Sequence, residues 1–181
     1  DEIAEDFEQA HPGVRVRLAF DGSSGLVDQL EGGAPADVFA SADEPTMDRA
    51  VAAGLTAGPP SVFPTGELTL ITPAGNPAGI TGLDSSLDGR KLVVCADGVP
   101  CGTATRLLAG RAGVDLRPVS EESSVTDVRG KVASGEADVG IVYATDALAL
   151  GDDVERIALP ASTQVLNRYP IAVLAGAGEP E

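Results

Sequence analysis

The sequence predicts an α/β fold, in which strands and helices alternate and most neighbouring strands run parallel. Short runs of Val, Ile and Leu alternate with longer runs whose apolar residues recur at helical spacing. No segment repeats at a fixed period. The chain has 181 residues, of which 43% are hydrophobic, so it can form one large domain or two small lobes. No long linker divides it, so two lobes would have to be joined by crossing strands.

Strands are predicted where apolar residues cluster between turn residues. VRVRLAF alternates and then runs apolar, ADVFAS lies between a Gly/Pro turn and an aspartate, and KLVVCA is a compact apolar run. The predicted strands are 14–20, 36–41, 66–73, 91–96, 138–143 and 168–176.

Helices are predicted where capping and stop residues bracket amphipathic patterns. The first residues fit the middle of an amphipathic helix, with Ile3, Ala4 and Phe7 on one face. Three further helices have predicted ends as well as starts: from near Pro45 to Gly54, from residue 100 to Gly110 or Gly113, and from Ser123 or Ser124 to Gly135. A helix is also predicted after Phe20, a short one within 82–90, and another after Tyr143.

The chain is strongly acidic, with 28 Asp and Glu against 12 Lys and Arg and a formal net charge of -16. Nucleic acids and anionic membrane surfaces bind basic patches, so neither is an expected partner. No apolar run reaches the length of about 18 residues that a spanning helix needs.

Two cysteines, Cys95 and Cys101, flank the sequence ADGVP. A redox or metal pair is one interpretation, but metal sites usually need four ligands and His11 is the only histidine. We favour a local disulfide, which would imply an oxidising compartment. Cys101 at a helix start also fits an activated thiolate, although the enzyme would need a base and His11 lies in an expected surface turn.

One pattern occurs at four places: a strand ends, a short loop follows, and a helix begins. The places are 20–26, 96–103, 123–125 and 142–147. Ligands of open α/β sheets bind at the carboxyl ends of strands, where helix N-termini offer free N–H groups to an oxyanion. Because neutral donors can hold a small anion, the acidic surface is no obstacle.

Each of these loops also has a purely structural interpretation. Serines at helix starts are common N-caps, and a tyrosine at a strand end is commonly half-buried. The aspartates fit caps or an acid–base pair, and we favour caps. The residues concerned are Ser23, Ser24, Ser124, Tyr143, Asp97, Asp127 and Asp146.

Four segments carry a resemblance to one known family. GSSGLVDQLEGGAPADVFASAD resembles the serine loop with the GAPADxFxSAD signature, and VPCGTA the VPxG loop, of the molybdate-binding proteins of ABC importers. SSVTDVRGKVASGEADVGIVYATDA is similar to their ligand helix, GEADxGIVY strand and TDA, and RYPIAV to their YPIAV strand. The resemblance covers essentially the whole chain in order.

The resemblance implies a type II periplasmic-binding-protein fold, with two α/β lobes around a central ligand cleft. Lobe I would comprise residues 1–67 and 170–181, and lobe II residues 68–169. The family's N-terminal strand with its first ligand serine, and its C-terminal helix, have no counterpart in this sequence. Either these segments lie outside this sequence or are removed by processing, or the chain is a fragment with a damaged site. We favour the first interpretation over a natural short form, and we expect lobe I to be incomplete without the missing strand.

The resemblance also implies a ligand set without any cationic side chain or metal ion. The anion would accept hydrogen bonds from the hydroxyl of Ser23, with Ser24 beside it, from the backbone amides of Cys101 and Val125, and from the Tyr143 hydroxyl. Molybdate or tungstate would be bound through its oxygens, and no cofactor is expected.

The implied function is that of a non-enzymatic receptor that delivers molybdate to an ABC-transporter permease. We expect an extracytoplasmic monomer in the periplasm or at the cell surface, where a lipid anchor before residue 1 is one option. The alternatives are a sulfate or phosphate receptor, the latter needing a carboxylate such as Asp97 or Asp127, and a thiol enzyme using Cys101. An effector-sensing domain of a transcription regulator would need a helix-turn-helix segment, which the sequence lacks.

Overall fold

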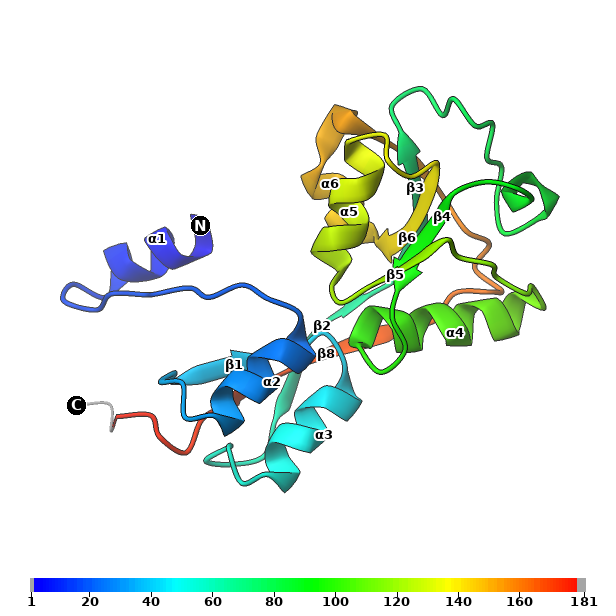
Figure 1. Ribbon diagram of the computed structural model, residues 1–181. Helices are drawn as coiled ribbons and strands as arrows, with labels where there is room; N and C mark the ends of the chain where they lie inside the picture. Colours follow the sequence, from blue (N-terminus) through cyan, green and yellow to red (C-terminus); the bar gives the residue numbers. More distant parts are fainter. Residues whose placement is uncertain (1, 179–181) are drawn as a thin grey trace.

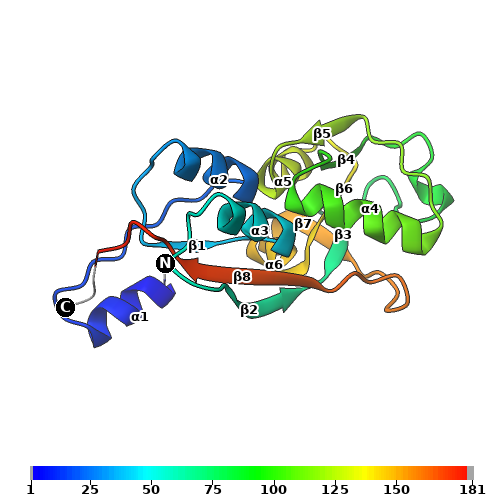
Figure 2. The same ribbon diagram turned by 90° about the horizontal axis from the view of Figure 1, so that it is seen from below.

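The computed structural model describes residues 2–178, which form two sheets flanked by helices (Figure 1). The first sheet has the strand order β1-β8-β2 and is antiparallel throughout. Its strands are β1 (Val38–Ala40), β2 (Ser61–Gly66) and β8 (Asn167–Val173). Helices α2 (Ser23–Glu31) and α3 (Glu44–Ala52) lie on one face of it (Figure 2).

The second sheet has the order β5-β4-β6-β3-β7. Its strands are β3 (Leu68–Pro73), β4 (Leu92–Cys95), β5 (Ser120–Glu122), β6 (Val139–Tyr143) and β7 (Val154–Ile157). The remaining elements are α1 (Glu2–Ala10), α4 (Pro100–Ala112), α5 (Val125–Ala133), α6 (Ala144–Ala149) and the 3₁₀ helices η1 (Ser85–Leu87) and η2 (Gly151–Asp153).

The prediction of mostly parallel sheets is wrong. Only β4 pairs parallel with its neighbours β5 and β6, whereas β3 is antiparallel to both β6 and β7. Parallel neighbours need a crossover connection, and α4 and α5 supply one only between β4, β5 and β6. The strand β3 instead follows directly from β2, one residue after Gly66.

The segment 14–20, predicted as a strand, forms no strand. Its pattern is right, but a strand needs a neighbour to pair with, and no described residue pairs with this segment. Leu18 exposes 48% and Phe20 81% of their surfaces. Helix α1 is present as predicted, yet contributes no buried side chain.

Three strands were missed, and each lies at the edge of a sheet: β2 in the first sheet, and β5 and β7 in the second. The sequences of β5 (SEE) and β7 (VERI) are largely polar and show no buried apolar run. Edge strands pair on one side only and commonly carry charged residues, so a search for apolar runs overlooks them.

Helix boundaries follow the predicted capping signals closely. Asp43 caps α3 by accepting a hydrogen bond from the Thr46 amide at 2.9 Å, and Pro45 lies in the first turn. Gly113 follows α4 with a φ of 67°, a left-handed conformation that glycine adopts without strain.

Two apolar cores stabilise the sheets separately. The larger one lies around β3, β4 and β6, with Leu70, Ile71 and Ile141 fully buried. The smaller one packs α2 and α3 on the first sheet through Val27, Met47, Ala50, Phe39, Ala172 and Leu174. The chain crosses between the sheets at 66–68 and again before β8, at residues 158–166. The lobe boundaries inferred from the resemblance stay a prediction.

Candidate ligand-binding site

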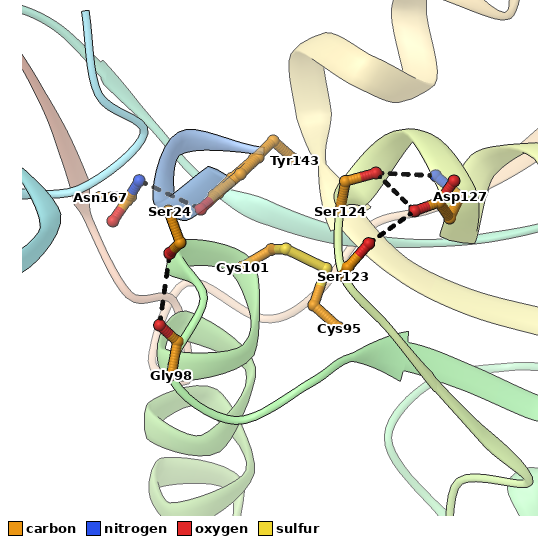
Figure 3. The surroundings of a disulfide bond; sticks show 9 residues. All are labelled: Ser24, Cys95, Gly98, Cys101, Ser123, Ser124, Asp127, Tyr143 and Asn167. Atoms are coloured by element: carbon orange, nitrogen blue, oxygen red, sulfur yellow. Dashed lines mark hydrogen bonds between the residues drawn. A yellow bond between two sulfur atoms is a disulfide. The ribbon is translucent and has the colours of Figure 1, made fainter. Parts of the chain in front are cut away.

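The N-termini of α2, α4 and α5 meet between the two sheets (Figure 3). The Ser24 hydroxyl, at the start of α2, reaches the Gly98 carbonyl oxygen before α4 at 3.5 Å. A Cβ added to Gly22 would lie 3.0 Å from the carbonyl oxygen of Ser123, just before α5. Three of the four predicted loops are therefore neighbours, although the loop before α2 lies about 75 residues from the loop before α4 and about 100 residues from the loop before α5.

Helices α4 and α5 each present a first-turn amide at this meeting point. Pro100 opens α4 and has no N–H, so Cys101 carries the first amide of that helix. Val125 is the first residue of α5, after the N-cap Ser124. First-turn amides have no partner within their own helix and carry the positive end of the helix dipole. Both amides are thus suited to an anion.

The two serines of α2 are not helix caps, contrary to the structural interpretation. The N-cap of α2 is Gly22, and no side chain caps this helix. The Ser23 hydroxyl oxygen instead accepts a hydrogen bond from the Ala42 amide at 3.0 Å, and the residue is only 8% exposed. Ser23 is therefore held by a loop of the first sheet rather than by its own helix.

Ser124, in contrast, is the cap that was predicted. Its hydroxyl oxygen accepts from the Asp127 amide at 3.2 Å and donates to the Asp127 carboxylate at 2.8 Å. Ser123 also donates to that carboxylate, at 3.2 Å. The hydroxyl protons of Ser123 and Ser124 are therefore both donated to the Asp127 carboxylate in the first turn of α5.

Tyr143 is the last residue of β6 and is only 4% exposed. Its hydroxyl oxygen accepts a hydrogen bond from the side-chain amide of Asn167 at 3.4 Å. Burial raises the pKa of Tyr143, and the nearby Tyr169 and Asp43 raise it further. Its hydroxyl therefore stays protonated at neutral pH and is a neutral donor.

Sequence reasoning missed Asn167. The side chain is 8% exposed and donates to the Ala42 carbonyl as well as to Tyr143. Its only signal in the sequence is a polar residue directly before RYPIAV, at the start of an apolar strand.

The three aspartates do not form an acid–base pair. Asp97 forms an ion pair with Arg106 at 2.6 Å, and Asp146 one with Arg129 at 3.1 Å. Burial raises the pKa of Asp146, and Arg129 opposes this shift. Capping was thus the wrong interpretation for these two, whereas Asp127 takes part in the cap of α5 as an acceptor.

Cys95 and Cys101 form a disulfide, as predicted, which joins the end of β4 to the first turn of α4. A thiol enzyme using Cys101 is therefore excluded, because the sulfur is neither free nor ionisable. Within residues 2–178, no group of three or more His, Cys, Asp or Glu side chains is placed to hold a metal ion.

Replacing both cysteines by serine is expected to lower the free energy of unfolding by about 2 kcal/mol, because a short closed loop is lost from the unfolded chain. Urea unfolding monitored by circular dichroism measures the change. Wild-type protein treated with a reductant should show the same loss. Equal stability of the double variant and the oxidised wild type would contradict a stabilising role for this disulfide.

Within the described part of the chain, no helix has the length and apolar character needed to cross a bilayer.

Comparisons with known proteins identify relatives over essentially the whole chain. A family described as "Bacterial extracellular solute-binding protein" matches residues 1–181. The molybdate-binding protein ModA of Mycobacterium tuberculosis H37Rv is 47% identical over 180 residues, which are 99% of this chain and 69% of that protein. The ModA of Escherichia coli K12 is 30% identical and aligns with 97% of this chain and 72% of its own length.

Solved structures with the same fold include the periplasmic molybdate-binding protein of Azotobacter vinelandii. It is 22% identical with a TM-score of 0.81, and the match covers 98% of this chain and 81% of that one. The sulfate-binding protein SubI of Mycobacterium tuberculosis, also 22% identical, has a TM-score of 0.78 over 97% and 71% of the two chains. These matches confirm the predicted periplasmic-binding-protein fold.

Proposed function

The chain belongs to the bacterial extracellular solute-binding proteins, and from this premise we propose that it captures molybdate and hands it to the permease of an ABC importer. Members of this family are carriers, not enzymes. The observation that carries the proposal is the 47% identity over 180 residues to a molybdate-binding protein. The meeting of three helix N-termini between the sheets supports it physically, since such a site favours an anion.

The proposed ligand set consists of five neutral groups. They are the hydroxyls of Ser23, Ser24 and Tyr143 and the backbone amides of Cys101 and Val125. The Ser24 hydroxyl has one proton, so it gives up its long contact with the Gly98 carbonyl when it turns to the anion. Molybdate or tungstate is bound through its oxygens, with no cofactor or metal ion. Hydrogen bonds to a charged group contribute about 1.5–3 kcal/mol each. Five of them can offset the cost of binding and reach a dissociation constant below about 1 μM, which corresponds to about −8 kcal/mol.

Phosphate is a poorer candidate, because at neutral pH it carries a proton that needs an acceptor in the site. The nearby carboxylates already have partners: Asp97 pairs with Arg106, and Asp127 accepts from Ser123 and Ser124. Sulfate has the charge and shape of molybdate but is smaller, so selection against it rests on the size of the site.

The receptor acts outside the cytoplasm, and the Cys95–Cys101 disulfide supports an oxidising compartment. We further propose that it works as a monomer, in the periplasm or at the cell surface, where a lipid anchor is one way to hold it near the permease.

Isothermal titration calorimetry tests the proposal. We expect molybdate and tungstate to bind with dissociation constants below about 1 μM and sulfate and phosphate to release no heat at the same concentrations. All four titrations use the same ionic strength, so that general charge effects cancel. Binding of sulfate or phosphate as tight as that of molybdate would contradict the proposal, as would the absence of binding by all four.

A further inference from the structure

Asn167 lies where the chain crosses from the second sheet into the first. It is the first residue of β8 and pairs with Gly66, the last residue of β2. The residue is 8% exposed, and its side chain contacts both sheets' surroundings. It donates to the Ala42 carbonyl, in the loop after β1 of the first sheet, and to the Tyr143 hydroxyl, at the end of β6 in the second sheet. Figure 3 shows this amide beside the Tyr143 hydroxyl.

The orientation of the Asn167 amide follows from these partners. A carbonyl oxygen can only accept, so the nitrogen of Asn167 must face Ala42. The same nitrogen has a second hydrogen, which is directed at the Tyr143 oxygen. The Tyr143 hydroxyl oxygen therefore accepts its hydrogen bond from the Asn167 side chain.

This arrangement decides what the hydroxyl can do. A tyrosine hydroxyl has one proton, and within residues 2–178 no protein group accepts it. Ser23 is arranged in the same way, because its oxygen accepts from the Ala42 amide and its own proton is not used within that part of the chain. Ala42 thus connects the two donors through its backbone. Its N–H, in the peptide group shared with Ser41, reaches Ser23. Its C=O, in the peptide group shared with Asp43, accepts from Asn167, which also contacts Tyr143.

We infer that Asn167 is a positioning residue for the oxyanion: it occupies the acceptor side of the Tyr143 hydroxyl, so that the Tyr143 proton points at the ligand, and ties this donor to Ser23 through Ala42. The inference rests on the proposed function, since it assigns how two of the proposed donors are oriented. A serine or tyrosine without such a partner would lose rotational freedom only when the anion binds, at a cost in affinity.

The first test is a double-mutant cycle for molybdate affinity, measured by calorimetry with Asn167→Leu, Tyr143→Phe and both together. Asn167→Leu alone is expected to weaken molybdate binding roughly tenfold. When it is added to the Tyr143→Phe protein, we expect a further loss of affinity of less than about threefold, because the effects of contacting residues are coupled. A residue that only supports the fold would cause the same loss in both backgrounds, and additive losses therefore contradict the inference. Arg168→Gln, at the next position of the strand with an exposed side chain, is the matched control and should bind like the wild type.

A second test needs no ligand and uses the fact that Asn76 and Asn167 are the only asparagines in the sequence. Protein labelled with ¹⁵N-asparagine should give two pairs of side-chain NH₂ signals by NMR, one pair for each asparagine. Tyr143→Phe should shift the Asn167 signal, because its acceptor is removed, and leave that of Asn76, which donates to the Ile80 carbonyl, in place. An unchanged Asn167 signal overturns the inference even if Asn167→Leu fails to fold. If the wild type binds no molybdate, the proposed function fails, whereas this test still decides the contact between Asn167 and Tyr143.

Discussion

Replacing Val125 by proline is expected to weaken molybdate binding by about tenfold or more, since a hydrogen bond to a charged group contributes about 1.5–3 kcal/mol. Val125 is the first residue of α5, a position where proline fits because its φ suits the helix and no intrahelical bond is lost. The residue before a proline must be extended, and Ser124 already is, with φ -147° and ψ 158°. The substitution therefore removes the amide hydrogen without changing the backbone, and it also replaces the half-buried Val125 side chain, which packs against the larger core.

The affinity of Val125→Pro is measured by calorimetry, and its stability by thermal unfolding without ligand. Val125→Ala is the matched control: it keeps the amide and shortens the side chain, and should bind molybdate nearly as well as the wild type. If Val125→Pro binds as tightly as Val125→Ala, the Val125 amide is not a ligand. A large loss of stability in Val125→Pro would instead show that the turn before α5 does not tolerate proline.

Replacing Gly102 by alanine is expected to destabilise the fold by about 3 kcal/mol or more, as overpacking of backbone does in its severe cases. The added Cβ would lie 1.8 Å from the carbonyl oxygen of Ala96 and 2.7 Å from its carbonyl carbon. These are backbone atoms next to the disulfide between Cys95 and Cys101, so neither side can give way cheaply. The first turn of α4 must shift, and the Cys101 amide shifts with it.

Urea unfolding measures this loss, and calorimetry shows whether molybdate binding weakens as well. Gly110→Ala is the matched control in the same helix, because a Cβ there meets nothing within 4 Å. It should stabilise the protein by up to about 1 kcal/mol, since alanine favours helix more than glycine does. Equal stability of Gly102→Ala and the wild type would contradict the close approach of α4 to Ala96.

The serines illustrate how much of the site could be predicted from the sequence. Capping of α5 by Ser124 was predictable because the donor, the Asp127 amide, is three residues away. The same rule failed for Ser23, whose partner, the Ala42 amide, lies 19 residues away in another loop. A local rule identifies the helix start in both cases, but not which group the hydroxyl reaches.

The strands show the same limit. The apolar runs of β3, β4, β6 and β8 predicted real strands because burial on a sheet favours such residues. The equally suitable run at 14–20 remained unpaired among the described residues. Strand formation depends on a partner that the run itself does not specify.

For this chain, the sequence by itself determined the helix boundaries, the apolar strands, the disulfide and the segments that resemble molybdate-binding proteins, because each depends on residues close together in the chain or on a matching motif. Only the tertiary structure decided the antiparallel pairing of β3, the meeting of three helix N-termini, and the position of Asn167 between Ala42 and Tyr143. The last contact joins residues that lie 125 and 24 positions apart. Hydrogen bonds over such separations form only once both sheets have folded, so no local pattern encodes them.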